Sequence, residues 1–285
     1  SEFNPSTCSF IRKKVSSNQR DISIYICKSI SISSIANIHV HSKNLPMFSS
    51  INSIKYSDII SGDRVLSLCD IVFTTSSIYE FHIKHGNALD KFVIVRDFTN
   101  VKTDKLLKIM NKFTKTNISI FVYTHILYQF QQWILPQLPI TYSYTIFTGN
   151  SDHSFDKTYN QILLSPKITR VYAQNLNVVS DKCVVLPIGI ANKMWTHGDI
   201  HAVYKTLLEN YINVKPNDIY VNINTSTFPY RKNVLEACIA NGLVSSGSKP
   251  YPQYLQELAS HKFCLCVRGN GLDTHRFWEA LYLGV

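Results

Sequence analysis

Residues 263–285 read FCLCVRGNGLDTHRFWEALYLGV, and no other segment of the chain says more about its fold. The apolar start is typical of a buried strand, and the two glycines that follow leave backbone N–H groups open to an anion. The pattern then predicts a helix that Asp273 or Thr274 caps. A strand, a glycine loop and a helix in this order indicate an α/β unit with a ligand at the carboxyl end of the strand.

The same alternation of short apolar runs and helical patterns continues along the rest of the chain. We expect strands at residues 22–27, 71–74, 92–95, 118–123, 141–147, 183–186, 219–224 and 263–267. We expect helices at residues 103–114, 200–211, 231–240, 250–260 and 274–283. Strands that alternate with helices predict an α/β fold with a parallel, doubly wound sheet.

A change in composition near residues 187–189 divides the chain, because only three of its ten glycines precede this point. A chain of 285 residues is long enough for two domains. We therefore expect an N-terminal Rossmann-like domain at residues 1–187 and a second α/β domain at residues 188–285. In such pairs the ligand binds in the cleft between the domains, at the carboxyl ends of the strands.

The composition is that of a globular protein, with 45% hydrophobic and 17% charged residues, and it excludes a disordered or fibrous chain. Lys and Arg number 29 against 19 Asp and Glu, a net charge of +10. This charge predicts a polyanionic partner, an anionic ligand in a basic cleft, or a generally basic surface. No apolar run approaches the roughly 18 residues of a membrane-spanning helix, so we expect no membrane span. The seven cysteines form no Cys-x-x-Cys pair, which favours reduced, buried thiols over a zinc site.

The predicted helix after the glycine loop carries two charged residues on one face. Arg276 lies in the first turn, where its guanidinium can pair with a phosphate through two hydrogen bonds. Glu279 follows three residues later, and a carboxylate there can accept two ribose hydroxyls. Together with the glycine loop, these side chains predict a nucleoside diphosphate site. The alternative is an ordinary surface pair between the two residues.

Residues 264–285 resemble the C-terminal signature of the exostosin-like glycosyltransferases, in which a strand and glycine loop lead to a Ser/Thr-x-Arg-x-x-Glu helix. In that family a Pro-Val strand follows, and because the chain stops at Val285 we expect an incomplete C-terminal domain. Weaker similarity extends back to about residue 140. It includes residues 172–175, 186–192, 195–198 and 220–225.

The resemblance implies a GT-B fold, with two Rossmann-like domains that face a central cleft. The C-terminal domain would bind a nucleotide-sugar donor, and the N-terminal domain a glycan or glycoprotein acceptor. Gly269, Asn270 and Gly271 would form the phosphate loop, and Arg231 would be a second ligand of the diphosphate. The full set of expected donor-site residues is Asn224, Arg231, Arg268, Gly269, Asn270, Gly271, Thr274, Arg276 and Glu279.

An inverting transfer needs a carboxylate or histidine beside the acceptor hydroxyl as general base. Asp152 is our first candidate and His153 the second, because they follow the expected strand at residues 141–147, where cleft residues belong. Asp97 is the third candidate. The alternative for Asp152 is a turn or helix-capping role.

Metal-dependent sugar transferases use an Asp-x-Asp pair, and the aspartates of this chain never stand two residues apart. We therefore expect a transferase without a metal or other cofactor, in which arginines and backbone donors stabilise the diphosphate. The alternative is a non-catalytic α/β protein that binds a polyanion or nucleic acid. The basic residues are spread along the chain and form no nucleic-acid module, so we expect no nucleic-acid partner. The compartment stays open between the cytoplasm and, if an anchor precedes this segment, the Golgi lumen.

A nucleotide-sugar epimerase is a third possibility. Such an enzyme would carry a Gly-x-Gly-x-x-Gly motif after the first strand. Residues 28–40 contain no glycine, which disfavours this class.

Overall fold

A computed structural model describes residues 26–28, 54–84, 93–95, 101–210 and 215–285. The contacts divide these residues into two compact units, each with its own sheet. Unit 1 comprises residues 26–28, 54–59, 199–210, 215–269 and 274–285. Unit 2 comprises residues 60–84, 93–95, 101–198 and 270–273.

Unit 2 contains a six-stranded sheet in the order β3-β2-β4-β5-β6-β7, and every neighbouring pair is parallel. The strands are β2 (Ile71–Phe73), β3 (Val93–Val95), β4 (Asn117–Tyr123), β5 (Ser143–Gly149), β6 (Ile168–Ala173) and β7 (Cys183–Val185). In the sheet, β3 lies on one side of β2, and the next strand along the chain, β4, lies on the other side of β2. The order therefore reverses between β2 and β4, where open α/β sheets usually bind their ligands at the carboxyl ends of the strands. The expected parallel α/β sheet is confirmed.

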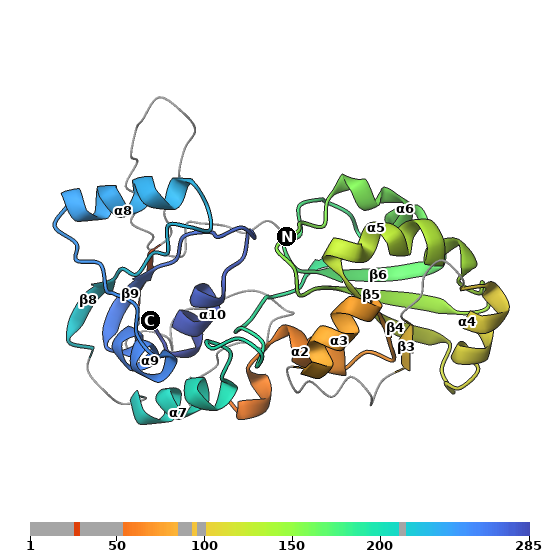
Figure 1. Cartoon of the computed structure of the whole chain (residues 1–285), viewed down its shortest axis with the longest axis horizontal. Coiled ribbons are helices and arrows are strands. Elements are labelled where there is room, and N and C mark those ends of the chain that lie inside the picture. The colour runs from red at the N-terminus through yellow and green to blue at the C-terminus, as the bar shows by residue number, and fades with distance from the viewer. Residues whose placement is uncertain (1–25, 29–53, 85–92, 96–100, 211–214) are drawn as a thin grey trace. The chain divides into compact units, whose positions relative to one another are not determined.

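Helices cover this sheet, and Figure 1 shows α5 and α6 over one face and α3 over the other. The α-helices are α2 (Gly62–Ser67), α3 (Ser76–Lys84), α4 (Thr103–Met110), α5 (Leu127–Gln129) and α6 (Asn160–Leu164). Short 3-10 turns lie at η5 (Thr124–Ile126), η7 (Leu135–Gln137) and η8 (Lys157–Tyr159), and η6 (Phe130–Ile134) is a π-helical turn. Because helices flank both faces, β2 is apolar along its length, and all three of its residues are fully buried.

Unit 1 has a three-stranded sheet in the order β1-β9-β8. Strands β8 (Asn217–Tyr220) and β9 (His261–Leu265) are parallel, and β1 (Ile26–Lys28) pairs with β9 in the antiparallel direction. The helices of this unit are α7 (Ile200–Asn210), α8 (Tyr230–Ala240), α9 (Tyr251–Ala259) and α10 (His275–Tyr282), and η3 (Tyr56–Asp58) is a 3-10 turn. All four helices confirm the sequence prediction to within a residue or two at each end.

Helix α10 ends in a glycine-dependent cap. Gly284 adopts a φ of 67°, which an L-residue rarely takes, and its N–H donates to the Leu281 carbonyl over 3.2 Å. The N–H of Val285 donates to the Ala280 carbonyl over 2.9 Å. These two bonds form a Schellman motif, so the sequence Leu-Gly-Val stops the helix as its composition predicts.

The structure departs from the sequence expectations in several places, among them helices α2, α3 and α6, which were not expected. The expected domain boundary at residues 187–188 lies inside unit 2, which continues to residue 198. Strand β8 ends at Tyr220 and not at residue 224, and its pairing with β9 ends at the same residue, opposite Cys264. Strand β6 was not expected at all. The expected first strand at residues 22–27 lies largely outside the described residues.

Candidate functional site

Arg231 links the segments that follow β8 and β9. It lies in the first turn of α8, and its guanidinium donates to three backbone carbonyls: Nε to Arg268 over 2.7 Å, Nη2 to Val267 over 2.7 Å and Nη1 to Asn224 over 3.1 Å. These bonds use one N–H of each nitrogen, so two of the five N–H donors of Arg231 remain for another partner. Arg231 therefore has two N–H donors available for a ligand, as its predicted role in ligand binding requires.

Arg276, the second residue of α10, packs on aromatic rings of unit 1. Its guanidinium carbon lies 5.2 Å from the ring centre of Tyr254 and 5.9 Å from that of Tyr220. The Nε atom is buried and has no hydrogen-bond partner among the described residues. Burial opposes the charge, but Tyr254, Cys264 and Glu279 nearby raise the pKa of Arg276, so the side chain stays cationic.

Arg231 and Arg276 are close enough for their charges to interact. Burial and the charge of Arg276 both lower the pKa of Arg231. Within the described part of the chain, no carboxylate lies within ion-pairing distance of either guanidinium. Two neighbouring cations without a paired carboxylate attract an anion.

Two further features of unit 1 lie beside Arg231. A Cβ atom on Gly269 would lie 3.5 Å from Nη2 of Arg231 and 3.9 Å from Oγ1 of Thr227. That Thr227 hydroxyl is buried and has no hydrogen-bond partner among the described residues. We call Thr227, Arg231, Gly269 and Arg276 the anion cradle. Its unused donors are the kind of groups that a phosphate oxygen satisfies.

Glu279 takes a position that its expected role does not fit. The residue is 3% exposed, and its carboxylate accepts hydrogen bonds from the Tyr251 hydroxyl over 2.9 Å and the Tyr254 hydroxyl over 2.5 Å. Each carboxylate oxygen accepts one of the two hydroxyls. The structure therefore gives Glu279 an internal role: it holds Tyr254, on which Arg276 packs, and we do not propose it as a ribose ligand. Nor does the pair form the alternative surface ion pair.

The remaining expected donor-site residues of unit 1 have varied surroundings. Arg268 is exposed, and its guanidinium lies 4.3 Å from the ring centre of Phe228. Asn224 supplies its backbone carbonyl to Arg231. Thr274 occupies the N-cap position of α10, as expected, but its side chain makes no capping hydrogen bond. Of these three residues, Asn224 and Arg268 contact the cradle, because the backbone carbonyl of each accepts a hydrogen bond from Arg231.

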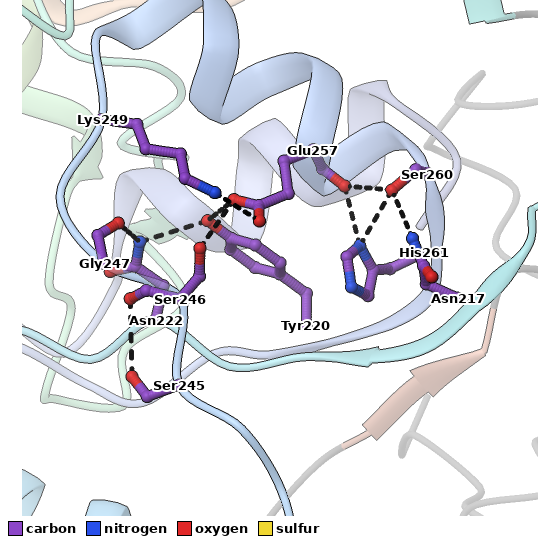
Figure 2. A network of polar contacts seen from close by, with 10 residues as sticks. All are labelled: Asn217, Tyr220, Asn222, Ser245, Ser246, Gly247, Lys249, Glu257, Ser260 and His261. Atoms are coloured by element: carbon purple, nitrogen blue, oxygen red, sulfur yellow. Dashed lines mark hydrogen bonds and ion pairs between the residues drawn. The ribbon is translucent and has the colours of Figure 1, made fainter.

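Tyr220, one of the two rings on which Arg276 packs, belongs to a second polar network. Figure 2 shows this network. The Tyr220 hydroxyl donates to Oε2 of Glu257 over 3.3 Å and accepts from Nδ2 of Asn222 over 3.1 Å. Ser246 donates to the same Glu257 oxygen over 2.7 Å, and Lys249 pairs with the other oxygen over 2.5 Å. The loop between α8 and α9 is thereby tied to the end of β8, which holds this side of the cradle in place.

Of the expected phosphate loop, Gly269 belongs to unit 1, whereas Asn270 and Gly271 belong to unit 2. Asn270 donates from Nδ2 to Oδ2 of Asp152 over 3.3 Å. The Asp273 N–H donates to Oδ1 of Asn175 over 3.0 Å, and a Cβ on Gly271 would lie only 2.9 Å from that same oxygen. Asp273 also accepts from the Ile188 N–H over 2.9 Å, and the N-cap position of α10 belongs to Thr274. Gly271 is thus required by the close approach of Asn175 in this unit.

Asp152 and His153 lie after β5 at the carboxyl edge of the sheet, and both side chains are exposed. The structure adds His125, which directly follows Thr124 at the end of β4. The ring centres of His125 and His153 are 6.4 Å apart. Desolvation of part of the ring, together with His153, lowers the pKa of His125, so it is neutral at pH 7. Asp97 lies outside the described residues.

Sequence reasoning missed His125 although a signal was present. It follows the expected strand at residues 118–123, as Asp152 follows the strand at 141–147. Thr227 carried no comparable signal, because nothing local distinguishes a buried, unpaired hydroxyl from a solvated one.

The described residues contain no group of three or more His, Cys, Asp or Glu side chains that could hold a metal ion. None of their helices is long and apolar enough to cross a membrane. In comparisons with known proteins, neither a protein-family model nor a curated protein matches the chain.

Proposed function

We propose that the chain is a glycosyltransferase of the GT-B type, which moves a sugar from a nucleotide-sugar to a glycan or glycoconjugate acceptor. The observation that carries the proposal is the pair Arg231 and Arg276 beside the carboxyl ends of β8 and β9, neither of which forms an ion pair with a carboxylate of the described residues. The motif of residues 264–285 supports the same class by resemblance. Unit 1 would bind the donor and unit 2 the acceptor.

In this proposal the anion cradle stabilises the diphosphate, which gains negative charge as the glycosidic bond to the sugar breaks. Arg231 would use its two remaining N–H donors, and Arg276 its unpaired Nε. Because two fixed guanidinium groups supply positive charge, the mechanism needs no divalent ion. The absence of an Asp-x-Asp pair from the sequence agrees with this.

The acceptor hydroxyl must lose a proton as it attacks the sugar, and unit 2 would supply the base. Asp152 is a carboxylate that receives one amide hydrogen bond, from Asn270, and His153 is the second candidate. His125 joins them, because a neutral imidazole can accept a proton at pH 7. Attack from the face opposite the leaving diphosphate would invert the anomeric centre.

Calorimetry and donor hydrolysis test this proposal directly. We expect the full chain to bind UDP- or GDP-sugars in excess EDTA, and Arg231→Ala and Arg276→Ala to weaken binding by about 1.5–3 kcal/mol each, the worth of a charged hydrogen bond. Lys232→Ala is the matched control, since Lys232 is an exposed cation next to Arg231 in the sequence. Equal affinity in all four proteins, or no binding of any sugar nucleotide, would contradict the proposal.

The net charge of +10 favours a second candidate, a non-catalytic protein that binds a polyanion. Such a protein would bind polyphosphate or heparin with an affinity that falls steeply with salt. It would not hydrolyse a nucleotide-sugar. The two assays together therefore separate a donor site from a general basic surface.

A further inference from the structure

Two thiols lie in contact at the end of β9. The sulfur atoms of Cys264 and Cys266 are 3.7 Å apart. Residues two apart on an extended strand point to the same side, which explains the contact. Cys264 is 1% exposed, whereas Cys266 is half-buried. Among the cysteines whose side chains the structure describes, this is the one pair with touching sulfurs.

The residues that follow this pair hold Arg231. The carbonyls of Val267 and Arg268 accept its two shortest hydrogen bonds, both 2.7 Å. A movement of Cys266 therefore acts on the next two peptide groups, to which the guanidinium is anchored.

We propose that Cys264 and Cys266 form a site of reversible oxidation, at which hydrogen peroxide converts the two thiols into an intramolecular disulfide. Cys266 is the more exposed thiol and reacts first: its sulfur takes an oxygen atom from the peroxide to form a sulfenic acid, and one water is released. The sulfur of Cys264 then attacks the Cys266 sulfur and loses its proton, and the hydroxyl leaves as a second water. Two thiols are thus oxidised while one peroxide is reduced to two waters.

The surroundings of Cys264 agree with its role as the second thiol to react. Contact with Cys266, followed by burial, raises the pKa of Cys264 well above its ordinary value. Cys264 is therefore a protonated, shielded thiol that does not meet peroxide in solution by itself. It acts only as the partner that resolves an oxidised Cys266.

Backbone geometry makes such a bond possible but strained. Cα atoms two residues apart on a strand are about 6.4–6.8 Å apart, at the upper end of the range that disulfides span. The sulfurs must close from 3.7 Å to bonding distance, which pulls the chain at Leu265, the last residue of β9, out of its extended form. A strained disulfide is readily reduced, so the modification is reversible by a small thiol.

Closure of this bond shifts the Val267 and Arg268 carbonyls and so disturbs the anion cradle. This consequence rests on the proposed function, whereas disulfide formation does not. Loss of one charged hydrogen bond in the cradle lowers affinity for a diphosphate by about tenfold or more.

Peptide mass analysis of the full chain tests the modification. After peroxide treatment, alkylation of free thiols and digestion with trypsin, cleavage after Lys262 and Arg268 releases residues 263–268, which contain both cysteines. We expect this peptide to escape alkylation and to weigh two hydrogen atoms less than its reduced form, and dithiothreitol to reverse the change. Cys266→Ser should abolish the response, while Cys238→Ser, a buried cysteine elsewhere in unit 1, should keep it.

Three results would overturn the inference. The peptide could remain fully alkylated, it could carry only sulfinic or sulfonic acid, or Cys264 could be linked to Cys27, the residue opposite it on β1. Inorganic pyrophosphate binding is then measured with reduced and oxidised protein. A disulfide that leaves pyrophosphate affinity unchanged overturns the link to the cradle, while failure to bind any sugar nucleotide in the reduced form contradicts the proposed function alone.

Discussion

The burial of Glu279 shows how one residue can look like a ligand in the sequence and be a structural group in the fold. A carboxylate removed from water must receive hydrogen bonds, and Tyr251 and Tyr254 on α9 provide one for each oxygen. Burial, together with the nearby carboxylate, raises the pKa of both hydroxyls, so they remain donors across the ordinary pH range. Glu279 thereby fixes the ring of Tyr254 on which Arg276 packs.

Removal of one of these hydroxyls should therefore cost stability. We expect Tyr254→Phe to lower the free energy of unfolding by about 1–3 kcal/mol, because the buried carboxylate loses a donor. Tyr128→Phe is the control, since Tyr128 is 54% exposed. Urea denaturation followed by circular dichroism measures both variants, and equal midpoints for the two would show that Glu279 does not depend on this bond.

At the scale of elements, Lys215 ties together the ends of two helices. Its Nζ donates to the Ala259 carbonyl over 2.8 Å and to the Leu283 carbonyl over 3.2 Å, just where α9 and α10 end. Helix C-termini leave carbonyls without partners, and an ammonium group satisfies them. Burial of this group lowers the pKa of Lys215 to about 8.

This shift predicts a pH dependence of stability. Below about pH 8, Lys215 is protonated in the folded and unfolded chains alike. Between pH 8 and the ordinary pKa of 10.5, the unfolded chain holds a proton that the folded chain has released, so the unfolding free energy contributed by this group rises with pH. Urea denaturation at several pH values should show this rise in the wild type and not in Lys215→Met. Parallel pH profiles for the two proteins would refute the assignment.

For the whole molecule, the proposed function divides the work between two units with separate sheets. The arginines of unit 1 would bind the donor, and the carboxylate and imidazoles of unit 2 would accept a proton. Binding and proton transfer should then respond to different substitutions. Such a separation is what a transferase with a donor side and an acceptor side requires.

We therefore expect Asp152→Asn to lower the transfer rate by about 10²–10⁴-fold, the usual effect of losing a general base, and to leave donor affinity unchanged. His153→Asn and His125→Asn are measured beside it, and the variant with the largest loss identifies the base. Asp156→Asn is the matched control, because Asp156 instead caps the short η8 helix through the Thr158 N–H. Near-full transfer in all three site variants would remove this edge of the sheet from the mechanism.

The α/β class and most elements could be read from the sequence, because strand and helix periodicities are local properties. The parallel sheet of unit 2 and the helices α7 to α10 follow from those patterns with small errors at their ends. Strand β6 escaped notice because its Thr169 and Arg170 interrupt the apolar run. The end of β8 was misplaced because a strand ends where its pairing ends, here at Tyr220 opposite Cys264, and the local sequence does not show the length of the neighbouring strand.

Pairings between distant residues could be settled only by the tertiary structure. The spacing of Arg276 and Glu279 shows that they share a face of α10, but it does not show whether that face is buried. Two tyrosines on another helix decide this, because they supply the donors without which the carboxylate would stay in water. Likewise, Arg231 was recognisable as a candidate, but its three carbonyl partners come from segments up to 37 residues away. Sequence patterns specify local conformation, whereas burial and hydrogen-bond partners depend on which segments the fold brings together.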